Sequence, residues 1–347
     1  MNRRAFLLIL LLGAAQLAAA QALPARLSSQ EFWDLSTELS EPDGTFRSDN
    51  LLSNESDFPD LIPDLVNTVQ PGVVYLGVGP EQNFTYISVL KPKIAFIIDI
   101  RRGNLDLHLL YKALFEMSRD RADFVSRLFS KKRPGGLTAR STVQEIFDAY
   151  GKVRPTEQVY QQNLKAIREY LTGKRALPLS ANDLSGVEYV LHSFYEFGFT
   201  IDYNSSSGGS AYNGKPVSYA ELMTAVDAMG RARSYLSSEQ AFLLLKDMQL
   251  KNLIVPVVGN FAGPQAIRAV GMYLKEKGAT VSAFYLSNVE QYLESGDGWR
   301  NFCNNSLTLP MADNSTFIRA VTDPRIGLTL TMGNMITDLT LGTVSCK

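Results

Sequence analysis

Two segments of the chain share one order of elements: an apolar run, a glycine-containing turn, a helix and a second apolar run. The first is "VVYLGVGPEQNFTYISVLKPKIAFIIDIRRGN", residues 73–104, and the second covers residues 252–293. Residues 253–258 are continuously apolar and rich in β-branched side chains, which is typical of a strand covered on both faces. Two strand–helix–strand units therefore predict an α/β fold with a mostly parallel sheet and helices on both faces.

The helix of the second unit has recognisable ends. Pro264 suits the first helical position and Gly278 suits the C-terminal cap. Residues 281–286 then form the next predicted strand. The stripe expected to face the sheet consists of Ile267, Val270 and Leu274.

Helical periodicity dominates the middle of the chain. We expect helices near residues 29–39, 104–118, 141–150, 156–171, 183–196, 217–235 and 238–248, and a possible short strand in "GFTIDY" before a Ser/Gly-rich loop. Residues 41–63 are acidic and contain proline, which indicates an ordered loop anchored by Phe46, Leu51, Leu52 and Phe58. The predicted organisation is a helix and irregular segment (23–70), an α/β domain in two parts (71–119 and 251–347, the second including the C-terminal tail), and a mainly helical insertion or cap between them (120–250).

The first residues read as an export signal. Arg3 and Arg4 precede an apolar stretch and then small residues with A-x-A sites, so we expect residues 1–22 to be cleaved near residues 20–22. The alternative is a buried N-terminal helix. The paired arginines resemble the twin-arginine type of signal, which implies a periplasmic or secreted protein. No later run is long and apolar enough for a stable membrane span.

The chain contains two cysteines, Cys303 and Cys346. In an exported protein an even count favours a disulfide, which here ties the C-terminal tail to the region near Trp299. Two unpaired thiols are the alternative, because spacing in the sequence says nothing about distance in space.

Composition and missing motifs exclude several functions. The net charge of −1 is unlike that of a nucleic-acid-binding protein, which has a strong basic excess. With two histidines that are not a pair at helical spacing, we expect no metal site. The chain also lacks the nucleophile elbow G-x-S-x-G, the phosphate-binding Walker loop and C-x-x-C. The expected partner is a small-molecule ligand, while the oligomeric state stays open.

The turn of the first unit carries the strongest indication of a site. Gly77 and Gly79 follow the strand, and Asp99 ends the next strand 22 residues beyond Gly77. Ligands of parallel sheets bind at this edge, and the spacing suits a carboxylate that binds ribose hydroxyls. Three polar residues of the same loop add hydrogen-bonding groups, namely Glu81, Gln82 and Asn83. The alternative is a tight turn in which Asp99 caps a helix or pairs with Arg101 or Arg102.

This stretch resembles the class I S-adenosylmethionine-dependent methyltransferases, and more broadly the Rossmann-like nucleotide-binding folds. The resemblance covers about residues 70–118 and 250–294 and implies that Gly77, Gly79 and Asp99 contact S-adenosylmethionine. Tyr75 stands where that family has an acid, and Glu81 stands in place of its third glycine. The chain is also similar to a family of uncharacterised exported bacterial proteins, which implies no activity.

Two further residues are candidates for contact with a substrate. Asn260 lies in "GNFAGP" after the strand 253–258, where the methyltransferase resemblance implies a substrate contact; the alternative is a Gly/Asn turn. His108 lies on the helix after Asp99 and could act as an acid or base, or be packed in the core.

Three functions follow from these residues. The first is a methyltransferase-like enzyme that uses S-adenosylmethionine, and the second is a non-catalytic binding module on the same fold. The third is a hydrolase with Glu81 and Asp99 as paired carboxylates, which requires about 5 to 10 Å between them.

Overall fold

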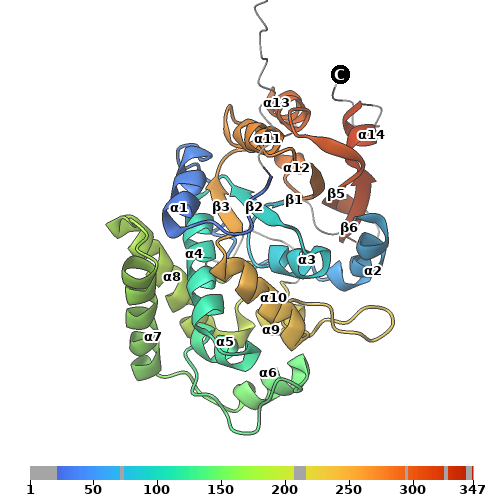
Figure 1. Ribbon diagram of the computed structural model, residues 1–347. Coiled ribbons are helices and arrows are strands. Elements are labelled where there is room, and N and C mark those ends of the chain that lie inside the picture. Colours follow the sequence, from blue (N-terminus) through green and yellow to red (C-terminus); the bar gives the residue numbers. More distant parts are fainter. Residues whose placement is uncertain are drawn as a thin grey trace, which may run out of the picture.

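The computed structural model describes residues 22–70, 74–206, 216–293, 296–323, 327–340 and 346, so the predicted signal peptide lies almost wholly outside the described residues. Six strands form one sheet in the order β3-β2-β1-β4-β5-β6 (Figure 1). Neighbouring strands run parallel except β6, which is antiparallel to β5. The strands are β1 (Val74–Gly77), β2 (Ile94–Asp99), β3 (Ile254–Val258), β4 (Val281–Ser287), β5 (Met311–Asp323) and β6 (Gly327–Asn334). This confirms the predicted α/β class, and the strand order is that of the doubly wound Rossmann fold with its last strand reversed.

Helices cover both faces of the sheet. Right-handed crossovers from β1 to β2 and from β3 to β4 move in opposite directions along the sheet, so their helices lie on opposite faces. One layer contains α3 (Gln82–Leu90), α4 (Arg102–Met117) and α10 (Glu239–Leu250), which pack together; the other contains α11 (Ala266–Glu276) and α13 (Gly298–Ser306) (Figure 1). The predicted stripe of α11 is buried at Ile267, Val270 and Leu274.

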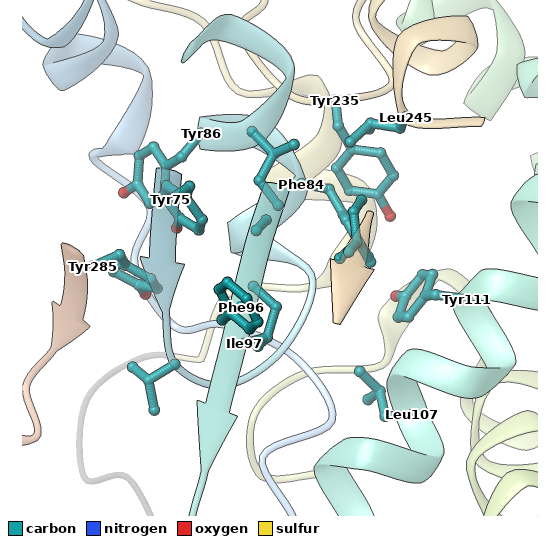
Figure 2. Packing of buried hydrophobic residues seen from close by; sticks show 14 of the residues in the cluster. Tyr75, Phe84, Tyr86, Phe96, Ile97, Leu107, Tyr111, Tyr235, Leu245 and Tyr285 are labelled. Atoms are coloured by element: carbon teal, nitrogen blue, oxygen red, sulfur yellow. The ribbon is translucent and has the colours of Figure 1, made fainter. Parts of the chain in front are cut away.

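The core beneath α3 contains several buried aromatic rings. Tyr75 and Tyr285 come from strands, Tyr86 comes from α3, and Figure 2 shows the three rings together. The rings of Tyr86 and Tyr285 have centroids 5.0 Å apart. On the other side of α3, the ring of Phe84 contacts Tyr111 and Tyr235 edge-on. Buried aromatic rings contribute large apolar areas to stability, so α3 is fixed firmly behind the turn that follows β1.

The described parts of residues 120–238 form a helical layer at one end of the molecule, mostly below the strands in Figure 1. Capping boxes at Thr142 and Ser180 begin two of these helices, as Ser/Thr followed three residues later by Glu or Asp predicts. The elements before α10 are α5 (Arg121–Leu128), α6 (Val143–Gly151), α7 (Glu157–Glu169), a π-helical turn (Tyr170–Lys174), α8 (Ala181–Phe197), a 3₁₀ turn (Gly198–Thr200) and α9 (Tyr219–Thr224).

Three local expectations were wrong. The helix expected over 217–235 ends at Thr224, because Asp227 accepts hydrogen bonds from the N–H groups of Met229 and Arg231 and builds a turn. The possible strand after Phe197 is the 3₁₀ turn. The loop expected over 41–63 is shorter, since a helix begins at Phe58 with proline in its first turn.

The N-terminal segment crosses the carboxyl edge of the sheet. It starts with α1 (Ser29–Glu38), which packs on β3, and ends with α2 (Phe58–Thr68). Between these two helices, the N–H of Glu41 donates a hydrogen bond to the carbonyl oxygen of Val258 at 2.8 Å. The N–H of Gly44 donates to the carbonyl oxygen of Ile100 at 2.8 Å. The predicted anchors Leu51, Leu52 and Phe58 are buried. Residues 41–57 are thus held where the parallel strands end.

The C-terminal part extends the sheet. The strands β5 and β6 were not predicted, and the remaining elements are α12 (Glu290–Leu293) and α14 (Met335–Thr340). Within the described ranges, no helix has the length and apolar character needed to cross a membrane.

The predicted bridge between Cys303 and Cys346 is present, with the two Cα atoms 5.5 Å apart. It closes a loop with a sequence separation of 43, for which chain entropy predicts about 4 kcal/mol of stabilisation. We expect Cys346→Ala to lower the free energy of unfolding by about that amount, measured by urea denaturation without reductant. A reductant should destabilise the natural chain equally and leave the variant unchanged. Equal stability of the two proteins would contradict a stabilising bridge.

Candidate functional site

A pocket of about 280 Å³ lies at the carboxyl edge of the parallel strands. It is bordered by the ends of β1, β2, β3 and β4 and covered by residues 45–54. The strand order reverses between β1 and β4, and this is the point where open α/β sheets bind ligands. Of the predicted site residues, Gly79, Asp99 and Asn260 line the pocket together.

The turn after β1 supplies backbone to the pocket. Gly79 has φ +74°, a left-handed conformation that glycine adopts without strain, and it lies against Asn50 of the covering segment. Gly77 does not line the pocket. A Cβ at Gly77 would overlap the side-chain oxygen of Asn83, so this glycine is required by close packing behind the turn.

Asn83 holds this turn from behind. Its side-chain nitrogen donates to the carbonyls of Val78 at 2.9 Å and Pro80 at 2.8 Å, and its oxygen accepts from the Tyr75 hydroxyl at 2.9 Å. Tyr75, which replaces the acid of the methyltransferase pattern, is therefore a buried partner of Asn83. These contacts make Asn83 a positioning residue for the pocket wall.

His108 supports the same turn from α4. Its Nε2 is 2.9 Å from the carbonyl oxygen of Gly79, which requires a proton on Nε2. Burial lowers the pKa of His108 to about 4, so the ring is neutral at physiological pH. The side chain is fully enclosed and does not line the pocket.

Glu81 and Gln82 are also buried, with exposed fractions of 0% and 1%. Glu81 precedes α3, and its carboxyl accepts the N–H of Ser53 at 3.3 Å. Burial raises the pKa of Glu81 to about 8, although hydrogen bonds from the N–H groups of Glu81 itself and Ser53 lower it. Glu81 is the residue directly before α3, but its side chain makes no capping hydrogen bond to the N–H groups of that helix.

Asp99 is engaged by Arg101. Its Oδ1 accepts the backbone N–H of Arg101 at 2.9 Å and Nε at 3.1 Å, and its Oδ2 accepts from the guanidinium at 3.1 Å. Arg101 also donates to the carbonyl of Asp49. A carboxylate has about four acceptor positions, so Asp99 keeps about one for a ligand.

Asn260 follows β3 and forms a turn through its side chain, but neither Gly259 nor Asn260 has the positive φ of the Gly/Asn turn that was the alternative expectation. Its Oδ1 accepts the N–H of Ala262 at 2.9 Å, and its own N–H donates to Glu41 at 3.1 Å. Among the described residues no hydrogen bond engages the side-chain NH₂ of Asn260, and the residue lines the pocket.

The end of β4 contributes groups that the sequence did not indicate. Ser287 lines the pocket with φ +50°, a strained backbone conformation of the kind found at functional sites. Its hydroxyl donates to Glu55 at 2.5 Å, and the Tyr285 hydroxyl donates to the same carboxyl at 2.7 Å. Burial raises the pKa of Glu55 to about 7, so this carboxyl can accept or release a proton near neutral pH.

The covering segment supplies an apolar and a basic wall. Phe46 meets the ring of Tyr292 edge-on with centroids 5.1 Å apart, and Arg47 donates to the Tyr292 hydroxyl at 2.8 Å. Phe261 and Leu293 add apolar surface. Phe46 was predicted to anchor this segment together with Leu51, Leu52 and Phe58. Unlike those three residues it is only half-buried, and it lines the pocket.

In the described part of the chain, no group of three or more His, Cys, Asp or Glu side chains is placed to hold a metal ion.

A protein-family model described as a domain of unknown function (DUF7790) matches residues 51–183 and 213–336 of the chain. The matched ranges contain Gly79, Asp99, Asn260 and Ser287, and they begin after Arg47. A search of curated proteins finds no match.

Proposed function

Because this chain belongs to the family defined by the domain of unknown function DUF7790, we infer its function from the pocket itself. We propose that the pocket binds a small nucleoside-type ligand, with S-adenosylmethionine as the first candidate. The observation that carries the proposal is the position of the pocket: it lies at the reversal point of the sheet, between Gly79 after β1 and Asp99 at the end of β2.

The lining fits the parts of a nucleoside. Gly79 allows close approach to the backbone, and the remaining acceptor position of Asp99 can bind one ribose hydroxyl. The rings of Phe46 and Tyr292 offer apolar surface to a flat base. A volume of about 280 Å³ is at the low end for ligand sites, which favours one nucleoside over a dinucleotide.

Glu81 weighs against ligands with a phosphate at the start of α3, because it adds a buried carboxyl directly before the helix whose N-terminus binds pyrophosphate in a dinucleotide fold. An adenosyl ligand without phosphate avoids this conflict. The same burial separates Glu81 from the pocket, which weakens the hydrolase reading with Glu81 and Asp99 as partners.

S-adenosylmethionine supplies an activated methyl group when bound. In such a reaction the Glu55 carboxyl could take up the proton that a hydroxyl or amine acceptor releases, passed through the hydroxyl of Ser287 at the pocket wall. The proton then resides on Glu55, whose pKa of about 7 suits both states.

A second candidate is a non-catalytic binding module. The observation that favours it is the ion pair of Asp99 with Arg101, since this pair satisfies most of the carboxylate without any ligand. The export predicted from the first residues, to a compartment where the cofactor is not expected to be free, also favours this candidate.

Calorimetric titration with S-adenosylmethionine and S-adenosylhomocysteine tests the proposal. We expect both to bind, and Asp99→Asn to lower their affinity about tenfold, because one hydrogen bond to a charged acceptor contributes about 1.5 kcal/mol. The matched control is Asp183→Asn, which breaks another buried acid–arginine pair, to Arg102, away from the pocket.

The outcomes separate the candidates. No heat with either compound, from protein shown to be free of bound ligand, rules out the adenosyl ligand. Binding that Asp99→Asn leaves unchanged rules out the placement of the ribose. Binding without methyl transfer to any acceptor tested favours the binding module.

A further inference from the structure

The charges that line the pocket do not balance. The described lining contains one acid, Asp99, and two cations, Arg47 and Arg101. Asp99 is paired with Arg101 through two side-chain hydrogen bonds of 3.1 Å. Among the described residues no carboxylate lies within ion-pair distance of Arg47, so its charge is not compensated by the pocket wall.

Arg47 is nevertheless held in place. Its guanidinium donates to the hydroxyl of Tyr292 at 2.8 Å and lies 5.3 Å from the centroid of that ring. Tyr292 is in turn supported by the edge of Phe46. A guanidinium has five N–H donors, and these contacts leave donors for a ligand.

Tyr203 lines the same pocket as the two arginines and is buried, whereas Arg47 lies at the exposed rim. Burial raises the pKa of the Tyr203 hydroxyl, and the nearby guanidinium groups of Arg47 and Arg101 lower it. The buried carboxyls Glu55 and Glu81 lie behind the wall and do not line it.

We propose that Arg47 binds a carboxylate of the ligand, so that the pocket selects nucleosides with an amino-acid or similar carboxylate tail over uncharged nucleosides. The inference rests on the proposed function and names the ligand class of the same pocket. One uncompensated guanidinium matches the single charge of a carboxylate, whereas a phosphate monoester carries nearly two negative charges and more acceptor oxygens than one arginine satisfies.

Three adenosyl compounds that differ in the tail test this assignment by calorimetric titration. S-adenosylhomocysteine carries a carboxylate, 5′-methylthioadenosine carries no anion, and adenosine monophosphate carries a phosphate. We expect the first to bind most tightly to the natural chain. In Arg47→Met, its affinity should fall about tenfold while that of 5′-methylthioadenosine changes less than about twofold. Added salt should lower the affinity for S-adenosylhomocysteine and leave that for 5′-methylthioadenosine unchanged.

Two variants serve as controls. Arg47→Lys keeps the charge and should recover part of the lost affinity, although a lysine cannot bind a carboxylate through two parallel hydrogen bonds. Lys165→Met removes an exposed positive charge on α7, outside the pocket, and should change nothing.

Each result decides one point. If Arg47→Met lowers the affinity for all three compounds equally, or for none of them, the carboxylate assignment is overturned. The proposal of a nucleoside pocket then still stands. Tighter binding of adenosine monophosphate than of S-adenosylhomocysteine overturns it in favour of a phosphate. If the natural chain binds none of the three, the proposed function fails, and the inference fails with it.

Discussion

Gly77→Ala should destabilise the protein by about 3 kcal/mol or more, although it adds a single methyl group. The added Cβ would overlap the side-chain oxygen of Asn83 and lie 2.9 Å from the ring and hydroxyl of Tyr75. All three groups are buried, so none can move into solvent. If Asn83 is displaced, the carbonyls of Val78 and Pro80 lose their hydrogen bonds.

Urea denaturation of a double-mutant cycle measures this effect. Asn83→Ala alone should also be destabilising, because it leaves buried polar groups unpaired. The double variant should be more stable than the sum of the two losses predicts, since truncation of Asn83 removes the overlap. The control is Gly103→Ala in α4, where a Cβ meets no atom within 4 Å and where alanine favours the helix. Additive losses at Gly77 and Asn83 would show that the overlap is not the cause.

The strand–helix–strand units could be predicted because they are local. A run such as residues 254–258 is apolar at every position, and its length fits a strand buried on both faces. The helix that follows has three inward residues at helical spacing and a terminal Gly278 with φ +59°. Such signals need no knowledge of distant parts of the chain.

The strands β5 and β6 lack that kind of signal. Residues 311–316, "MADNST", are polar for most of the first half of β5. In β6 the apolar residues Leu328, Leu330 and Met332 alternate with threonine in the sequence, but of the residues of this strand Leu330 alone is buried. Their pairing with each other completes the sheet, and periodicity alone did not separate them from a tail.

The site was predictable only where it follows a strand. Gly79, Asp99 and Asn260 occupy strand ends, and these ends meet at one edge because the strands are parallel. Arg47, Glu55 and Tyr203 come from segments far from these strands in sequence, so no spacing rule indicates them. The polarity of Glu81 to Asn83 does not by itself indicate a ligand, because buried polar side chains also satisfy backbone groups, as Asn83 does.

The buried acids should make the protein less stable as the pH rises. Burial raises the pKa of Glu81 from 4.5 to about 8 and that of Glu55 from 4.5 to about 7. The folded state therefore holds protons that the unfolded chain releases above about pH 4.5. Stability is then highest below that value, falls as the pH rises towards 8, and levels off above the folded pKa.

We expect Glu81→Gln to remove a large part of this dependence. A shift from 4.5 to about 8 corresponds to about 5 kcal/mol, so the natural chain should lose several kcal/mol between about pH 5 and 8. Glutamine keeps the shape and an acceptor oxygen for the N–H of Ser53, and it cannot ionise. The pH dependence of stability that remains in this variant should come from Glu55 and Asp106. Burial raises the pKa of Glu55 to about 7 and that of Asp106 to about 8.

Thermal and urea unfolding at several pH values give the measurement. The control is Glu31→Gln in the capping box of α1, an exposed acid whose pKa is lowered, chiefly by a hydrogen bond from the backbone N–H of Ser28. The ionisation of Glu31 is complete before the pH reaches about 5. The stability of Glu31→Gln should therefore change between about pH 5 and 8 as much as the stability of the natural chain does. If Glu81→Gln has the slope of the natural chain, Glu81 is already ionised in the folded protein. Its carboxylate would then add a negative charge at the start of α3 and strengthen the exclusion of phosphate ligands from that position.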